Sequence, residues 1–269
     1  MVPGLDEPIC LVAAEKIRLG RGAANGGGHI LMRVETSQRV IKACGVLCIL
    51  LMAGCATSQG SSPPPTSAPA DGWITLFDGS SLSQWRGYGR TDIPAPWTLE
   101  NGQVVLTGRG GGDLITRETF ADFELELEWQ ISAVGNSGIF FLADETDLPI
   151  YVHAPEIQIL DDARHPDNKQ ANRRSRSLYD MIAAPATSQR PAGDWNQIRI
   201  RHQAGHLQSW QNGEATVDIV IGSSQWNELV AASKFATWKG FGALREGHIG
   251  LQDHGDRVAF RNMRIRRLP

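Results

Sequence analysis

Cysteine is missing from this 269-residue chain after position 55; the four cysteines are Cys10, Cys44, Cys48 and Cys55. A disulfide framework, a cysteine-ligated zinc ion and a catalytic thiol are therefore excluded from the sequence that follows. An excess of charge of one sign is also lacking, because 26 Lys and Arg side chains stand against 29 Asp and Glu side chains. Without surplus positive charge to displace counterions from phosphates, the composition does not favour nucleic acid as a partner.

Long apolar runs are lacking too. The run over residues 43–53 is shorter than the roughly 20 residues that a membrane-spanning helix needs. Basic side chains precede it and Gly54-Cys55 follows it, which is typical of a secretory signal. The ending Met52-Ala53-Gly54-Cys55 resembles a bacterial lipobox, whose cysteine is lipidated and becomes the mature N-terminus. We therefore expect a lipoprotein signal peptide over residues 32–55, with lipid on Cys55 as the contact to the membrane and a location in the bacterial cell envelope, in the periplasm or at the outer membrane.

The segments on either side of this signal lack hydrophobic periodicity. Residues 1–31 precede Met32, which by itself starts a signal peptide of ordinary length, so we expect residues 1–31 to be an extension from a misplaced start codon. Residues 56–71 are rich in Ser, Pro and Ala and predict a tether without a core. A disordered leader and tether are thus expected before a folded domain over residues 72–269, whose terminal strands we expect to lie close together.

The folded domain has the pattern of an all-β protein. Residues 123–131 and 196–202 alternate apolar and polar side chains without a break, which predicts strands with one buried face. Residues 258–266 do the same with one irregular step, which predicts a bulge near Asn262. Many short strands without an internal repeat favour a β-sandwich or jelly roll.

Two further local patterns predict a hairpin and a helix. Asn212-Gly213 stands between the strand-like residues 206–211 and 214–217, and this dipeptide supplies the positive φ angles of a tight hairpin turn. Residues 225–234 place their apolar side chains on one helical face, so a helix is expected there.

Polar side chains spaced by two residues point to a functional face. Glu156 and Gln158 share one side of a predicted strand, and so do Gln252 and His254. A strand that places Glu and Gln side by side gives up one apolar face, which is costly unless that face meets water or a polar ligand. A solvated strand face is the plain alternative, but we expect these four side chains to converge on one concave surface.

An ordered set of motifs spans the domain. It comprises Gly72-Trp73-Ile-Thr-Leu-Phe77-Asp78-Gly79, Phe123-Glu-Leu, Gly135-Asn-Ser-Gly-Ile139, Pro155-Glu-Ile-Gln-Ile-Leu-Asp-Asp162, Leu178-Tyr179, Gly193-Asp-Trp-Asn196, Trp210-Gln-Asn-Gly213, Ser233-Lys-Phe235, Phe241-Gly242, Gly247-His-Ile-Gly-Leu-Gln-Asp-His-Gly255 and Phe260-Arg-Asn262.

In this order the motifs resemble the 3-keto-disaccharide hydrolase family. The resemblance implies a concanavalin A-like jelly roll, a carbohydrate substrate and hydrolysis of glycosides oxidised at C3. One departure is Leu142, where many members carry an Arg at the end of the strand. The candidates for a replacement cation are Arg164, Arg173, Arg174 and Arg176.

The implied chemistry assigns roles to the polar residues. A ketone at C3 acidifies the C2 proton, so a base, a polariser of the C3 oxygen and an acid for the leaving oxygen are required. Glu156 and His254 are expected to be the base and the acid, in either order. The candidates for contacts to sugar hydroxyls are Asn136, Gln158, Tyr179 and Gln252.

A divalent metal ion is a possible cofactor, since it would polarise the ketone as a Lewis acid. Asp161 and His165, together with His254, are the side chains of suitable type, although their spacing matches no established metal signature. Two other classes stay open: a non-catalytic carbohydrate-binding lipoprotein with a lectin-like fold, and a scaffold lipoprotein. Glu156 and His254 in one pocket would favour an enzyme, whereas a shallow aromatic strip without this pair would favour a binding module.

Overall fold

The structure is a computed structural model that describes residues 72–146, 149–185 and 189–269. The expected leader, the lipidation site Cys55 and the tether lie outside the described residues, so those expectations stay predictions. No helix in the described ranges is long and apolar enough to cross a membrane.

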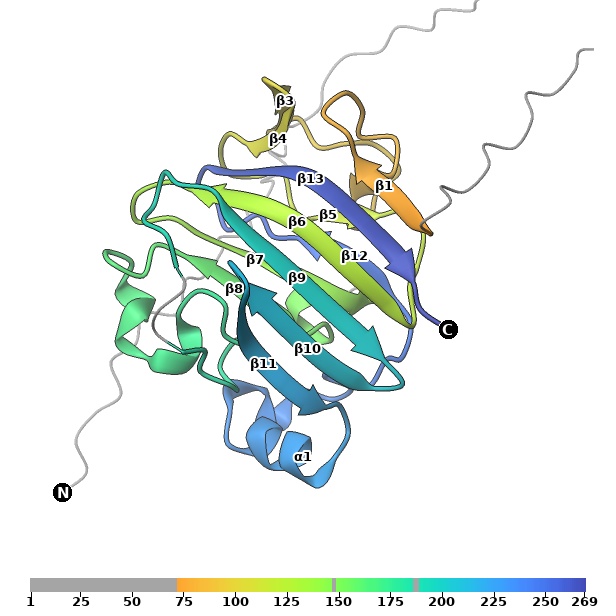
Figure 1. Ribbon diagram of the computed structural model, residues 1–269, viewed down its shortest axis with the longest axis vertical. Helices are drawn as coiled ribbons and strands as arrows, with labels where there is room; N and C mark the ends of the chain where they lie inside the picture. The colour runs from red at the N-terminus through yellow and green to blue at the C-terminus, as the bar shows by residue number, and fades with distance from the viewer. Residues whose placement is uncertain (1–71, 147–148, 186–188) are drawn as a thin grey trace, which may run out of the picture. The chain divides into compact units, whose positions relative to one another are not determined.

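The described residues form two antiparallel sheets, which confirms the all-β fold class (Figure 1). The eight-stranded sheet has the order β11-β10-β9-β6-β13-β4-β3, and β1 also pairs with β13. Its strands are β1 (Trp73–Phe77), β3 (Trp97–Glu100), β4 (Gln103–Leu106), β6 (Phe123–Ile131), β9 (Asn196–Gln203), β10 (His206–Gln211), β11 (Glu214–Val220) and β13 (Val258–Arg267). The five-stranded sheet has the order β2-β5-β12-β7-β8, with β2 (Trp85–Gly87), β5 (Leu114–Thr116), β12 (His248–Leu251), β7 (Asn136–Ala143) and β8 (Glu156–Leu160).

The core lies between the two sheets and follows from the alternation in the sequence. In β6, Phe123, Leu125 and Trp129 are fully buried in this core, and they pack with side chains such as Ile139 of the opposite sheet. Burying each large apolar side chain contributes about 1.5–3 kcal/mol, so this layer dominates the stability of the sandwich. The polar residues between them face outward: Glu126 of β6, for example, pairs with Arg264 of β13.

The predicted turns and the pairing of the chain ends are confirmed. Asn212 and Gly213 have φ angles of 52° and 86°, and β10 and β11 pair around them. Asn262 has a φ of 52°, and the register of β13 against β6 shifts between Arg261 and Arg264, which is the expected bulge. Strands β1 and β13 pair directly, so both ends of the described domain lie in one sheet.

The predicted helix is shorter than the sequence pattern indicates. Helix α1 covers Ser224–Ala231, with the Ser223 hydroxyl accepting a hydrogen bond from the backbone N–H of Trp226. A separate 3-10 turn, η4 (Lys234–Thr237), follows, and Ser233 caps it in the same way. Ser233 caps this second turn, so the helix ends before it. The apolar periodicity alone does not reveal that break. The remaining 3-10 turns are η1 (Ile150–Val152), η2 (Pro166–Lys169) and η3 (Ala171–Arg173).

Candidate active site

Strand β8 presents its polar side chains on the outer face of the five-stranded sheet. Ile157 and Ile159 are fully buried in the core between the sheets. Because side chains alternate along a strand, Glu156 and Gln158 face the opposite side. The neighbouring strand β7 runs antiparallel, with Gly138 opposite Gln158.

The segment after β12 continues this polar face. The backbone N–H of Gln252 donates to the carbonyl of Gly138 over 3.0 Å, and the Ser137 hydroxyl donates to the carbonyl of Gln252 over 2.9 Å. These two bonds hold the segment against β7 after the regular strand has ended at Leu251. The side chains of Gln252 and His254 are thereby brought to the same side as Glu156.

All of these side chains line one cavity of about 420 Å³, which is within the size range of small-molecule sites. The predicted convergence of the two pairs spaced by two residues is therefore confirmed. The lining comprises the six side chains expected to bind or react with substrate, Asn136, Glu156, Gln158, Tyr179, Gln252 and His254, and four others, Asp113, Tyr151, Lys234 and Asp253.

Gly138 makes room for Glu156. A Cβ atom at position 138 would lie 2.0 Å from Glu156 Oε1 and 2.6 Å from its Cδ, far inside van der Waals contact. Gly138 has no positive φ angle, so its backbone does not require glycine. The missing side chain is needed here by the neighbouring carboxyl group, which explains the glycine of the Asn-Ser-Gly motif.

Burial controls the protonation of Glu156. Removal from water raises the pKa of the Glu156 carboxyl to about 8, and the charge of Asp113 acts in the same direction while that of Lys234 opposes it. Burial likewise lowers the pKa of the Lys234 ammonium, and the charge of Glu156 opposes that shift. A carboxyl group that titrates near neutral pH is well matched to proton transfer.

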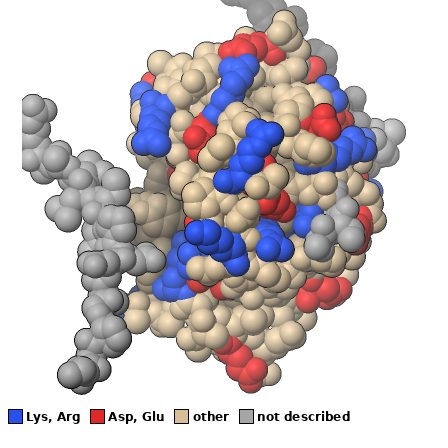
Figure 2. Space-filling view, turned by 90° about the vertical axis from the view of Figure 1, so that its left-hand side faces the viewer, with Lys and Arg blue, Asp and Glu red and all other residues tan. Residues whose placement is uncertain are grey.

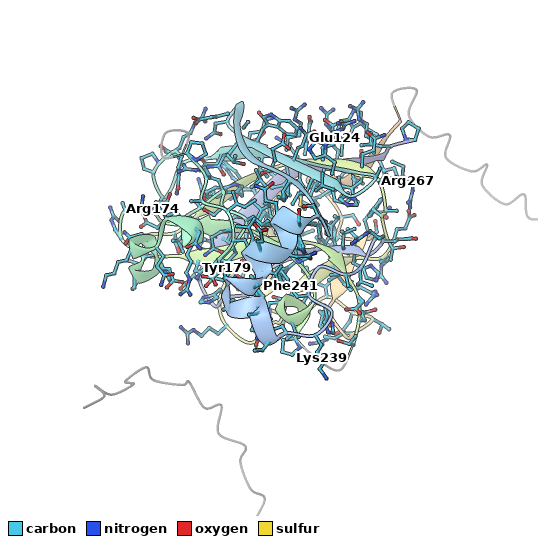
Figure 3. All side chains as sticks on the ribbon, turned by 90° about the horizontal axis from the view of Figure 1, so that it is seen from below. Glu124, Arg174, Tyr179, Lys239, Phe241 and Arg267 are labelled. Atoms are coloured by element: carbon cyan, nitrogen blue, oxygen red, sulfur yellow. The ribbon has the colours of Figure 1, made fainter. Side chains whose placement is uncertain are left out.

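Lys234 reaches the cavity from η4. Its backbone N–H donates to Asp180 Oδ2 over 2.8 Å, and its ammonium lies 4.2 Å from the centre of the Tyr179 ring. The backbone N–H of Tyr179 in turn donates to the carbonyl of Glu156 over 3.0 Å. Figure 3, viewed from below, shows Tyr179 close to the helical segment that contains α1.

Sequence reasoning assigned no role to Lys234. Its signal was its place in the Ser233-Lys-Phe235 motif, whose middle residue is the one that could carry charge. The arginines expected to replace the missing family Arg do not line the cavity. Arg173 pairs with Asp180 over 2.6 Å, and Arg176 is buried beside Asp162.

The other two arginines are farther out. Arg164 is exposed, and Arg174 lies on the periphery of the domain in Figure 3. Lys and Arg side chains on the side that carries β8 are interspersed with Asp and Glu and do not form one patch (Figure 2). Among the charges that surround the cavity, it is Lys234 that supplies a cation to its lining.

His254 belongs to a chain of polar contacts. Its Nε2 lies 3.5 Å from the Asn136 amide nitrogen, and Gln158 Nε2 donates to Asn136 Oδ1 over 3.2 Å. Burial lowers the pKa of the His254 imidazole, which favours its neutral form. The cavity thus holds a carboxyl group whose pKa is raised and an imidazole whose pKa is lowered.

A second carboxyl group, that of Asp113, also lines the cavity. The backbone N–H of Asp253 donates to Asp113 Oδ1 over 2.8 Å, and burial raises the pKa of Asp113 to about 7. Asp253 Oδ2 accepts from the backbone N–H groups of Gly111 and Gly112, each over 2.9 Å, which ties the glycine-rich loop to the cavity. Asp113 follows a run of glycines in the sequence and carries no local signal of function.

Of the residues considered for a metal ion, Asp161 and His165 lie outside the lining and His254 lies within it. Asp161 Oδ2 accepts from the backbone N–H of Val134 and Oδ1 from that of Ala163, so the carboxylate serves local structure. His165 Nδ1 accepts from the backbone N–H of Asp167. Across the described ranges, no three His, Asp or Glu side chains form a group that could hold a metal ion. This donor set does not fit a metal ion as it stands.

Comparison with known proteins is decisive about the family. Residues 72–266 match the model of the 3-keto-alpha-glucoside-1,2-lyase-like domain, which covers most of the chain. This chain belongs to that family. A curated 3-keto-disaccharide hydrolase of Bacteroides thetaiotaomicron is 43% identical to this member over 228 residues, which span 73% of this chain and 79% of the relative.

Solved structures place this family member among lectin-like sandwiches. A protein described as a glycosyl hydrolase of Parabacteroides distasonis is 27% identical, with a TM-score of 0.69 over 74% of this chain and 95% of that one. A Bacillus subtilis protein with a galectin-like fold is 14% identical, with a TM-score of 0.50 over 72% of this chain and 94% of that one. The latter likeness shows the fold alone.

Proposed function

We propose that this chain is an envelope-anchored hydrolase that cleaves 3-keto-glycosides by removal of the C2 proton, β-elimination and rehydration. The observation that carries the proposal is the cavity in which Glu156 and His254 lie together with Lys234. Family membership and the 43% identical 3-keto-disaccharide hydrolase support hydrolysis of glycosides oxidised at C3.

The reaction balances without an external oxidant or reductant. The C2–H bond breaks, its proton passes to the base, and its electron pair forms an enolate with the C3 ketone. The enolate then expels the C1 oxygen, which leaves with its bonding pair and takes a proton from the acid. Water adds to C1 of the resulting enone, C2 regains a proton, and the net reaction is hydrolysis. Both catalytic groups return to their starting states.

The shifted pKa values support a choice between the two proton-transfer roles. A carboxylate whose pKa is raised by burial is a stronger base than an ordinary one, so we assign removal of the C2 proton to Glu156. An imidazolium whose pKa is lowered is a stronger acid, so His254 is assigned to protonate the leaving oxygen. Asn136, Gln158, Tyr179 and Gln252 line the same cavity and are assigned to sugar hydroxyl contacts.

Lys234 is assigned to the C3 oxygen. The elimination develops negative charge on that oxygen, and a fixed cation in a cavity with little water stabilises such charge strongly. The backbone N–H of Lys234 donates to the Asp180 carboxylate, and the ammonium lies over the Tyr179 ring. Because Asp161 and His165 are occupied elsewhere, no step is routed through a metal ion.

The envelope location rests on the leader sequence. The basic segment, the short apolar run and the lipobox-like ending at Cys55 support lipid attachment. A lipid on Cys55 and the Ser/Pro/Ala tether over residues 56–71 would hold the enzyme at a membrane surface. The proposed location is the periplasm or the outer membrane of a bacterium.

One assay separates this function from its alternatives. The purified chain is offered a 3-keto-glucoside and the same glucoside without oxidation, beside the Glu156→Gln variant. We expect cleavage of the keto sugar alone, and loss of most of that cleavage in the variant. Similar rates on both sugars would instead indicate an ordinary glycosidase that uses the two carboxyl groups of Asp113 and Glu156. Binding of either sugar without cleavage would indicate a carbohydrate-binding module.

A further inference from the structure

Two buried amides join the side chains assigned to proton transfer. Asn136 is 3% exposed and Gln158 is 1% exposed, and they lie between the carboxyl group of Glu156 and the imidazole of His254. Both came from the sequence as candidates for sugar contacts. Their contacts with each other and with the two ionisable groups give them a second task.

The amide of Gln158 fits two opposite orientations. In one, its nitrogen donates to Asn136 Oδ1 over 3.2 Å, and its oxygen faces Glu156. In the other, its nitrogen donates to Glu156 Oε1 over 2.9 Å and to the carbonyl of Ser137 over 3.2 Å. The amide oxygen then faces Asn136 over 3.2 Å, so the second orientation requires the Asn136 amide to turn as well.

The ionisation of Glu156 decides between these orientations. A carboxylate only accepts hydrogen bonds, whereas a protonated carboxyl group can donate one. An ionised Glu156 therefore selects the orientation in which Gln158 donates to it. A protonated Glu156 donates its own proton to the Gln158 oxygen across the same contact. Each amide has its donor and acceptor at opposite sides, so turning the first reverses the hydrogen bond at the second.

We propose that Asn136 and Gln158 are positioning residues that couple the ionisation of Glu156 to the choice of the nitrogen that carries the proton on His254. With Glu156 ionised, the Asn136 oxygen faces His254, and Nε2 carries the proton and donates it. With Glu156 protonated, the Asn136 nitrogen donates to Nε2, and the proton resides on Nδ1.

The charged groups around the two side chains do not by themselves couple Glu156 to His254. The charged groups that act on Glu156 are Lys234 and Asp113. Those that act on His254 are Asp256, His165, Asp167 and Arg109. The charge of Glu156 is not among the main influences on His254. Burial lowers the pKa of His254 below its ordinary value of 6.5, so the imidazole is neutral while Glu156 titrates near pH 8.

The coupling matters for the reaction, and this part rests on the proposed function. Once Glu156 has taken the C2 proton, the amide chain holds the His254 proton on Nδ1, the nitrogen that does not contact Asn136. The Nδ1–H group of the neutral imidazole is then the one free to donate a hydrogen bond to the leaving oxygen.

The test measures the tautomer of His254 and not the activity. The full chain is labelled with ¹⁵N-histidine, and the His254 signals are assigned by their loss in a His254→Gln variant. Between pH 7 and 9 we expect the protonated and unprotonated nitrogen signals of the neutral imidazole to exchange places as Glu156 titrates. The Gln158→Met variant keeps the length of the side chain but removes the amide, and we expect the exchange to be lost. Gln197→Met, at an exposed position of β9, is the matched control and should keep it.

Two results would overturn the coupling. One is an unchanged tautomer across this pH range in the wild type, and the other is the same exchange in Gln158→Met, which would indicate direct electrostatic influence. If Gln158→Met does not fold, Asn136→Leu breaks the chain at its second amide and must give the same loss. Because no substrate is present, a failure here leaves the hydrolase assay untouched, and a failure of that assay leaves the tautomer measurement valid.

Discussion

A methyl group added at Gly138 offers the sharpest perturbation of the site. The new Cβ would lie 2.0 Å from Glu156 Oε1, 2.6 Å from Cδ and 2.8 Å from Cγ, so the whole carboxyl group must move. Glu156 is only 7% exposed, so its carboxyl group must move within the cavity that it lines. The backbone at Gly138 accepts alanine, so the collision with Glu156 is the principal effect of the substitution.

The magnitudes separate loss of function from loss of fold. Overpacking a buried position costs about 1–3 kcal/mol, and for a domain of this size each kcal/mol lowers Tm by roughly 2–4 °C. Displacing a catalytic group by about 1 Å costs about 100-fold in rate. We therefore expect Gly138→Ala to remain folded and to lose about two orders of magnitude in kcat/KM on a 3-keto-glucoside.

The assay pairs steady-state kinetics with thermal unfolding. Gly108→Ala is the matched control, because no atom lies within 4 Å of its added Cβ, and it should match the wild type in both measurements. Gly250→Ala is a second comparison: its Cβ would approach Ile150 and Phe140 and not Glu156, so it should lower Tm more than it lowers activity. Near-normal turnover in Gly138→Ala would refute the placement of Glu156 as the base.

Three further predictions address charge and location. The pKa of the Glu156 carboxyl group, followed by carboxyl NMR of the full chain, should rise in Lys234→Met and fall in Asp113→Asn. The first variant removes a charge that lowers the pKa of Glu156, and the second removes one that raises it. Shifts in the same direction in both variants would contradict this electrostatic account. Between about pH 4.5 and 8, Glu156 keeps its proton in the folded protein but has lost it in the unfolded chain. The free energy of unfolding therefore falls as pH rises through that window, by up to about 1.4 kcal/mol per pH unit from this group. Urea unfolding should give a flatter pH dependence for Glu156→Gln, and equal slopes would argue against the raised pKa. Cys55→Ser should release the protein from bacterial membranes on fractionation, and retention of that variant would count against lipid anchoring.

Local patterns were sufficient for most of the fold. The alternation in residues 123–131 matches β6, because its apolar side chains face the core and its polar side chains the opposite side; among the polar ones, Glu124 is buried. Asn212-Gly213 and the bulge at Asn262 were readable because positive φ angles restrict residue type. The end of α1 could not be predicted in this way, because it depends on Ser233 capping a separate turn.

The candidate site was readable only where its residues share a strand. Glu156 with Gln158, and Gln252 with His254, reveal their common face through a spacing of two. Lys234 gives no such sign, because its backbone is held by a hydrogen bond to Asp180, 54 positions away in the sequence.

The position of Asp113 is likewise set at long range, by the backbone of a distant segment. Its carboxyl group accepts from the N–H of Asp253, which is 140 positions away. The space for Glu156 depends on the absence of a side chain at Gly138, which lies on the neighbouring strand β7. Such pairings across the fold are decided by tertiary packing, and no window of the sequence contains them.

The most direct measurement of the central claim follows the hydrogen at C2. A 3-keto-glucoside is cleaved by the full chain in D₂O, and the released keto sugar is examined for deuterium at C2, with the unreacted substrate and a non-enzymatic incubation of the product as controls. The elimination mechanism predicts deuterium at C2 of the product, at a level above the non-enzymatic exchange, and loss of this incorporation together with cleavage in Glu156→Gln. Cleavage that leaves the original hydrogen at C2 would contradict the mechanism.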